Sequence, residues 1–447
     1  MVLKTEAWRT WKLSGPIILG ELTQMALGII DNIMVGSISY KHLAAAALVN
    51  SVMNIPFVLG IGMTMSISQT VSMAHGRRDD LKVSHYLYNG FWLSSVVAIL
   101  IALLLNAGKN VLFHLGQDHQ VANLAAPFLQ LMGWSTIPML MFISLKQFTD
   151  GLERTRTAML LSLSALPVNV FINWLLIYGN WGFPRLELTG AGLGTLITRF
   201  VILIVFVVVL QKHALYKKYI SVRENQWKLK AKTLKELLHI GVPSSLQVAM
   251  ESGAFAVSAI LIGTLGAVQL AAHQIAISCA SVAFMVSWGL AQGGSIRVSN
   301  AWGRNSWKDI NSIGKSTLLS ALLYGISCAV IFICLRNILP RAFNGNPAVL
   351  SLSAILMLYA AVFQVSDATQ AVGAGLSRGI KDVKIPTVYI GIAYWLIGIP
   401  LGCLMAFKFK FGAAGMWMGF VAGLTFSSLF LNMRFFRTLR KQKASAG

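Results

Sequence analysis

The chain of 447 residues is 56% hydrophobic and only 12% charged, with a mean hydropathy of +0.67. A soluble globular domain has roughly 25% charged residues, so this composition excludes a soluble protein and indicates an integral membrane protein. The formal net charge of +22 would suit a nucleic-acid partner, but the placement of the charges along the chain favours a different explanation.

Twelve apolar stretches follow one another along the chain. About 20 apolar residues span a bilayer as a helix, and lipid offers no partner to open backbone groups, so these stretches should be helices. Four of them lie near residues 14–37, 188–211, 238–265 and 316–335. Windows free of Asp, Glu, Lys and Arg supply the others, at 42–76, 83–108, 119–145, 157–184, 252–296, 342–366, 385–407 and 411–433. The expected fold class is therefore an all-α membrane protein with twelve transmembrane helices.

The basic residues gather on one side of the predicted helices. That side includes the segments KKYISVRENQWKLKAKTLK (217–235) and RFFRTLRKQK (434–443). Loops rich in Lys and Arg remain in the cytoplasm, so both termini should be cytoplasmic in the inner membrane of a bacterium. Membrane lipid, and no nucleic acid, is the partner that this pattern predicts.

The two halves of the chain resemble each other. A shift of 227 residues, from Gly36 to Gly263, aligns GSISYKHLAAAAL (36–48) with GTLGAVQLAAHQI (263–275), and it also pairs Pro16 with Pro243. Six crossings per half keep both halves in the same orientation, which implies a pseudo-two-fold axis along the membrane normal. The cleft between two such lobes is the expected place for a substrate.

This repeat predicts four parts of the chain. We expect an N-terminal six-helix lobe at 1–211, a basic cytoplasmic linker at 212–236, a C-terminal six-helix lobe at 237–434 and a basic cytoplasmic tail at 435–447.

Four acids fall inside the predicted helices: Glu21, Asp31, Glu251 and Asp367. Each costs about 2.5 to 3.5 kcal/mol at a helix centre, so the set needs a compensating role. Binding a cation or a proton in a wet cavity would supply that role. The alternative is that these acids join helices by pairing with Ser, Asn or the intramembrane base Arg199.

Polar residues share the helix faces of these acids. Gln364 and Gln370 lie on the face of Asp367, Gln247 lies on that of Glu251, and Gln24 on that of Asp31. Two asparagines one turn apart offer amide oxygens suited to a hard cation such as Na⁺. The predicted substrate or ion cavity comprises Glu21, Gln24, Asn169, Asn173, Gln247, Phe363, Gln364 and Gln370.

Pro16 and Pro243 lie early in the first helix of each half. A proline inside a helix removes a hydrogen bond and permits bending, so both residues are candidate hinges. Marking the start of the helix is the alternative. No nucleophile with a base partner and no cofactor motif is visible, so we expect neither an enzyme nor a bound cofactor.

Several motifs resemble the multidrug and toxic compound extrusion (MATE) family, in its NorM-type branch. They are GIIDNIMVG (28–36), LPVNVFINWLLIYGNWGFP (166–184), LAAHQIA (270–276) and FQVSDATQAVGAGLSRGIKD (363–382). The resemblance implies a secondary antiporter of two six-helix lobes that exports organic cations in exchange for Na⁺ or H⁺. It implies proton-linked switching at Asp31, and cation binding at Glu251 and Asp367, which would be the Na⁺ ligands. Glu21 departs from the family, where a neutral or amide residue is expected.

The mechanism expected from this resemblance is alternating access, in which drug cation and coupling ion compete for the same carboxylates in a monomer. A flippase for a lipid-linked or amphiphilic substrate is the main alternative. Its anionic cargo would need basic residues in the cavity, whereas four acids face only Arg199 and Lys146 here. A channel or an intramembrane enzyme fits the two-lobe repeat less well.

Overall fold

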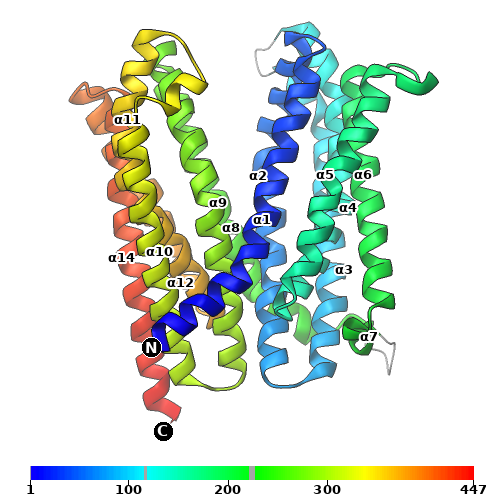
Figure 1. The fold of residues 1–447 in the computed structure, drawn as a ribbon, viewed down its shortest axis with the longest axis vertical. Coiled ribbons are helices and arrows are strands. Elements are labelled where there is room, and N and C mark those ends of the chain that lie inside the picture. Colours follow the sequence, from blue (N-terminus) through cyan, green and yellow to red (C-terminus); the bar gives the residue numbers. More distant parts are fainter. Residues whose placement is uncertain (1, 115–117, 221–226, 447) are drawn as a thin grey trace. The chain divides into compact units, whose positions relative to one another are not determined.

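The computed structural model describes residues 2–114, 118–220 and 227–446, and this part of the chain is helical without a strand (Figure 1). Twelve of its helical segments are long and apolar enough to cross a membrane, as the sequence predicts. They are α1 (Val2–Gly36), α2 (Tyr40–Gly76), α3 with η1 (Asp80–His114), α4 (His119–Gly151), α5 (Thr155–Tyr178), α6 (Glu187–Lys212), α8 (Ala231–Gly263), α9 (Ala267–Gly303), α10 (Trp307–Leu335), α11 (Pro347–Gly379), the segment Lys384–Lys408, and α14 (Ala413–Ala446).

The segment Lys384–Lys408 is not a uniform α-helix. It consists of α12 (Lys384–Gly391), the π-helical η4 (Ile392–Gly398), α13 (Ile399–Cys403) and the π-helical η5 (Leu404–Lys408). η1 (Gly108–His114) is the end of the third span, and shorter helices lie between the spans: η2 (Asn180–Gly182), α7 (Ala214–Ile220) and η3 (Leu339–Ala342). The expected basic tail at 435–447 continues α14 as far as Ala446.

The internal repeat reappears in the backbone of two loops. The α2–α3 loop begins with the last two residues of AHGRR, and the α9–α10 loop begins with the last two residues of AWGRN. Arg78 (φ 58°) and Asn305 (φ 54°), which the 227-residue shift pairs, both adopt the left-handed conformation. This conformation is uncommon for residues other than glycine, so its use at both positions supports a common structural plan for the two halves.

The chain forms two compact units whose boundaries differ from the expected 1–211, 212–236 and 237–434. The N-terminal unit is residues 19–245, and the C-terminal unit is residues 1–18 together with 246–447. The start of α1 thus packs with the C-terminal helices, and the start of α8 packs with the N-terminal helices. The change of unit falls two residues after Pro16 in α1 and two residues after Pro243 in α8.

Both prolines lie well inside their helices, because α1 begins at Val2 and α8 at Ala231. The alternative that each proline marks a helix start is therefore wrong. The sequence left this alternative open because the apolar stretch begins near each proline, whereas the helix itself begins 14 residues before Pro16 and 12 residues before Pro243.

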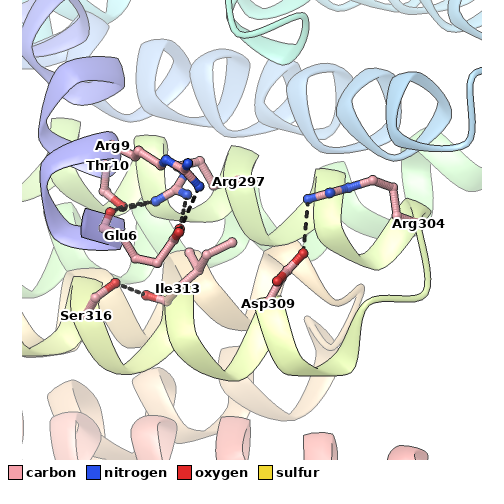
Figure 2. A network of polar contacts seen from close by, with 8 residues as sticks. All are labelled: Glu6, Arg9, Thr10, Arg297, Arg304, Asp309, Ile313 and Ser316. Carbon is pink, nitrogen blue, oxygen red and sulfur yellow. Dashed lines mark hydrogen bonds and ion pairs between the residues drawn. The ribbon is translucent and has the colours of Figure 1, made fainter. Parts of the chain in front are cut away.

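Polar contacts hold each of these helix starts to its unit. In the C-terminal unit, the Arg297 guanidinium on α9 forms an ion pair with Glu6 and donates to Thr10 Oγ1 at 2.7 Å (Figure 2). In the N-terminal unit, the Tyr86 hydroxyl on α3 donates to the Glu236 carboxylate on α8. These charge-assisted contacts are stronger than neutral hydrogen bonds.

Glycines allow the same close approach once in each unit. Gly62 on α2 lies against the backbone of Ser245, and Gly289 on α9 lies against Ile18. The 227-residue shift pairs the two glycines and also pairs Ile18 with Ser245. A methyl group on Gly62 would overlap backbone atoms of Ser245, so small residues are required at this crossing.

We expect Gly62→Ala and Gly289→Ala to lower the free energy of unfolding by about 1–3 kcal/mol, because the added methyl group overpacks each crossing. Thermal melting of the detergent-purified protein measures the change. Gly15→Ala is the matched control, since nothing lies within 4 Å of a methyl group there. Equal melting temperatures for all three variants would contradict this explanation.

Candidate functional site

The predicted site residues form two groups, one in each compact unit. Asp31 lies in the N-terminal unit with Glu21, Gln24, Asn169 and Asn173. Glu251 and Asp367 lie in the C-terminal unit with Gln247, Phe363, Gln364 and Gln370.

In the N-terminal unit, Asp31 on α1 is joined to two asparagines on α5. Asn173 Nδ2 donates to Asp31 Oδ1 at 2.7 Å and to Asn169 Oδ1 at 3.1 Å. Both asparagines are buried. A methyl group at Gly194 on α6 would overlap Asn173 Oδ1, so this glycine leaves the space that the amide occupies.

A cavity of about 50 Å³ adjoins this network, large enough for water. Its polar lining comes from Gln24, Asn169, Thr195, Thr198 and Arg199. Among the described residues, Asn169 Nδ2 has no hydrogen-bond partner, whereas its amide oxygen already accepts from Asn173. Asn169 therefore offers a donor rather than a cation ligand, and the predicted Na⁺ role of its oxygen would require the amide to turn.

Arg199 on α6 has partners inside the protein. Its Nη1 donates to Ser135 Oγ at 2.6 Å, and its positive charge acts on the carboxylate of Asp31. This arrangement agrees with a counter-ion for an intramembrane acid. It also places a cation beside the small cavity.

Glu21 lies in an ion cluster rather than with Asp31. The Lys146 ammonium on α4 contacts Glu21 Oε1 at 2.7 Å and Asp150 Oδ2 at 3.9 Å. Asp150 is only 1% exposed. The sequence analysis treated this acid as a loop residue, because it expected the helix to end near 145. Its spacing of four residues from Lys146 was the signal that could have identified the pair.

In the C-terminal unit, Tyr394 connects the predicted acids to an amide. Its hydroxyl donates to Glu251 Oε1 at 2.9 Å and lies 3.3 Å from Gln370 Oε1. Tyr394 is 2% exposed and belongs to the π-helical η4. No sequence pattern predicted this residue, because a π-helical turn changes which residues face inward. Such turns are frequent at functional sites.

Asp367 on α11 is a buried acid with an incomplete set of hydrogen bonds. It is 2% exposed, and among the described residues its Oδ2 has no hydrogen-bond partner. The negative charge of Glu251 acts on the carboxylate of Asp367. Two carboxylates with an amide oxygen and a phenol are hard oxygen donors, which suit Na⁺ or a shared proton.

The remaining predicted residues lie around this pair. Gln247 donates to Thr387 Oγ1 at 3.1 Å and accepts from Arg378 Nη1 at 3.2 Å. Gln364 is fully buried, and both of its amide atoms lack partners among the described residues. Phe363 packs edge-on against Phe255 (6.1 Å between ring centroids) and against Trp417 (5.4 Å).

Arg378 is a buried base that the sequence analysis did not select. It is 3% exposed at the end of α11, and its charge acts on Glu251. The C-terminal unit therefore contains two carboxylates and one guanidinium in its interior. Within the described ranges, no three His, Cys, Asp or Glu side chains converge as a metal site would require.

Comparisons with known proteins agree with this architecture. The probable multidrug resistance protein NorM of Rhizobium meliloti (strain 1021) is 33% identical over 443 residues, covering 97% of this chain and 94% of that protein. The eukaryotic MATE transporter AtDTX14 has a similar structure, with a TM-score of 0.89 at 20% identity, covering 99% of this chain and all of that one. A MOP superfamily transporter from Pyrococcus furiosus, described as having a binding pocket of reverse polarity that suggests a different function, aligns with a TM-score of 0.88 at 17% identity, covering 98% and 97%.

The MatE family model matches this chain over two stretches, residues 16–175 and 243–404. The stretches begin at Pro16 and Pro243, which confirms the internal repeat that the sequence predicts. The family consists of transporters rather than enzymes. On these grounds the chain belongs to the MatE family, the multidrug and toxic compound extrusion transporters.

Proposed function

We propose that this transporter is an antiporter that exports organic cations from the cytoplasm in exchange for Na⁺ or H⁺. The observation that carries the proposal is the pair Glu251 and Asp367, in which a buried carboxylate oxygen lacks a partner among the described residues. A buried carboxylate without a hydrogen bond is costly and gains stability from any cation or proton that reaches it.

The competition between drug and ion follows from the same chemistry. A ligand drives a conformational change only when its affinity differs between the two states. If the inward and outward states differ in the spacing of these acids, an incoming ion reloads the site and displaces the drug cation. Asp31, with its asparagine partners, is the corresponding proton-linked group of the N-terminal unit.

Pro16 and Pro243 are the hinges in this proposal. Each proline lies within two residues of the point at which its helix passes from one compact unit to the other. A proline removes one backbone hydrogen bond, which lowers the cost of bending at that point. The units would then move by bending α1 and α8.

We place the protein as a monomer in the cytoplasmic membrane of a bacterium, with both termini in the cytoplasm. The asymmetry of Lys and Arg supports this orientation. The curated relative named above is bacterial.

A flippase for an amphiphilic anion is the second candidate, and one observation favours it. Arg199 and the amide nitrogen of Asn169 line the small cavity of the N-terminal unit, where no acid is among the lining residues. Such a cavity attracts an anionic group. The proximity of Asp31 to Arg199 weakens that attraction, so we favour cation export.

Asp367→Asn and Glu251→Gln should each reduce ethidium efflux by roughly tenfold or more, the scale of a typical coupling free energy. The reason is that each variant removes a charge that holds the cation. Efflux from cells, normalised to the amount of protein in the membrane, measures the effect. Asp118→Asn is the control, because this acid caps α4 and asparagine caps equally well. Normal efflux by both variants would remove the basis for assigning these residues.

Tyr394→Phe should lower the KM for the coupling ion by about tenfold, because the Glu251 carboxylate loses a hydrogen-bond donor that competes with the ion for it. Transport by purified protein in liposomes, measured at several ion concentrations, gives this KM. Tyr389→Phe is the matched control: it lies in the same segment, and its ring packs against Phe430. A change of similar size in both variants would indicate a packing effect instead.

Efflux of a fluorescent organic cation from liposomes should respond to only one of two imposed gradients, Na⁺ or pH. The responding gradient identifies the coupling ion, since the carboxylate pair can bind either ion but the cycle exchanges one. No efflux under either gradient would argue against antiport and would favour the flippase function.

A further inference from the structure

A groove of about 900 Å³ lies between α10 and α14 in the C-terminal unit. It is separate from the carboxylates described above, and the proposed antiport does not use it. Five basic side chains line the groove: Lys308, Lys315, Arg437, Arg440 and Lys443. No acid is among its lining residues.

These charges have no counter-ion in the part of the chain that the structure describes. None of the five basic residues forms a salt bridge there, and the nearby acid Asp309 pairs with Arg304 at 3.5 Å (Figure 2). All five are exposed on the helix surfaces. The groove therefore presents a concentrated positive charge that only an external anion can neutralise.

Apart from Asn311, the rest of the groove is apolar. Its apolar lining consists of Leu318, Leu319, Leu322, Met433, Phe436 and Leu439. On α10 these residues follow Lys308 and Lys315 toward the middle of the span, and on α14 Met433 and Phe436 precede the basic residues. The charges thus lie at one end of the groove, and the apolar surface extends from them along both helices.

Close packing of the two helices forms the base of the groove. Phe435 on α14 packs on Gly314 of α10, where a methyl group would lie 2.6 Å from the ring. Trp307 lines the charged end, and tryptophan prefers the boundary between hydrocarbon and headgroups. We therefore infer that the charged end of the groove lies at the membrane surface, on the side of the chain's C-terminus.

We propose that this groove binds an anionic phospholipid of the cytoplasmic leaflet. The phosphate lies among the five basic side chains, and the acyl chains lie along the leucines and Phe436. Basic pockets between transmembrane helices on the cytoplasmic side bind such headgroups. A soluble phosphate or an acidic peptide would neutralise the charges but would not cover the adjoining apolar surface.

The test compares two lipids with identical acyl chains, dioleoyl phosphatidylglycerol and dioleoyl phosphatidylcholine. Each is titrated onto the full-length protein in a neutral detergent, and native mass spectrometry counts the bound lipids. The wild type should retain phosphatidylglycerol in preference to phosphatidylcholine. Lys315→Gln with Arg440→Gln should weaken phosphatidylglycerol binding by more than about tenfold, because each charge near the surface contributes about a fivefold gain in affinity.

The matched control is Lys12→Gln with Lys384→Gln, which removes the same charge from exposed positions of the same unit outside the groove. It should bind phosphatidylglycerol as the wild type does. Arg437→Gln with Lys443→Gln is a second groove variant, in case the first does not fold. Ethidium efflux, measured in parallel, separates this proposal from the antiport, because a failure of either leaves the other readout unchanged.

Three results would overturn the proposal. One is equal affinity of the wild type and the groove variants for phosphatidylglycerol. Another is equal retention of the two lipids by the wild type. The third is displacement of phosphatidylglycerol by inorganic phosphate at an equal concentration, which would identify a free anion as the ligand.

Discussion

Lipid supplies no hydrogen-bond partners, and the structure depends on this constraint at every level. It requires the backbone of each span to be helical, and it requires each intramembrane acid to find a partner within the protein. Asp31 accepts a hydrogen bond from Asn173, Glu21 forms an ion pair with Lys146, and Glu251 accepts a hydrogen bond from Tyr394. In the described part of the chain, one oxygen of Asp367 and both oxygens of Asp150 have no hydrogen-bond partner, although Asp150 lies 3.9 Å from the Lys146 ammonium. Asp367, which forms no ion pair there, is the acid that we propose binds a mobile cation.

The repeat explains how two units built alike are joined. The first segment of α1 packs with the C-terminal helices, and the first segment of α8 packs with the N-terminal helices. The crossings at Gly62 and Gly289, together with the ion pair of Arg297 and Glu6, fix these segments to their units. In the proposed mechanism, α1 and α8 would bend where they leave these contacts, close to Pro16 and Pro243.

The basic residues divide into two kinds by their surroundings. Arg199, Lys146 and Arg378 lie within spans, and each acts on a nearby acid. The five cations between α10 and α14 have no such partner and face outward. In the proposed transport mechanism the first kind adjusts the charge of the interior, whereas in the proposed lipid site the second kind presents positive charge to the membrane surface. The proposed lipid site would thus account for part of the large net charge without involving the proposed transport site.

The sequence by itself determined the twelve spans, the internal repeat and the helices that bear Asp31, Glu251 and Asp367. It could do so because hydropathy and helical spacing are local properties of the chain. Only the tertiary structure decided that Tyr394 joins Glu251 and that Glu21 pairs with Lys146. These contacts join helices more than 100 residues apart, and the first also depends on a π-helical turn. Side-chain spacing within one helix carries no information about either contact.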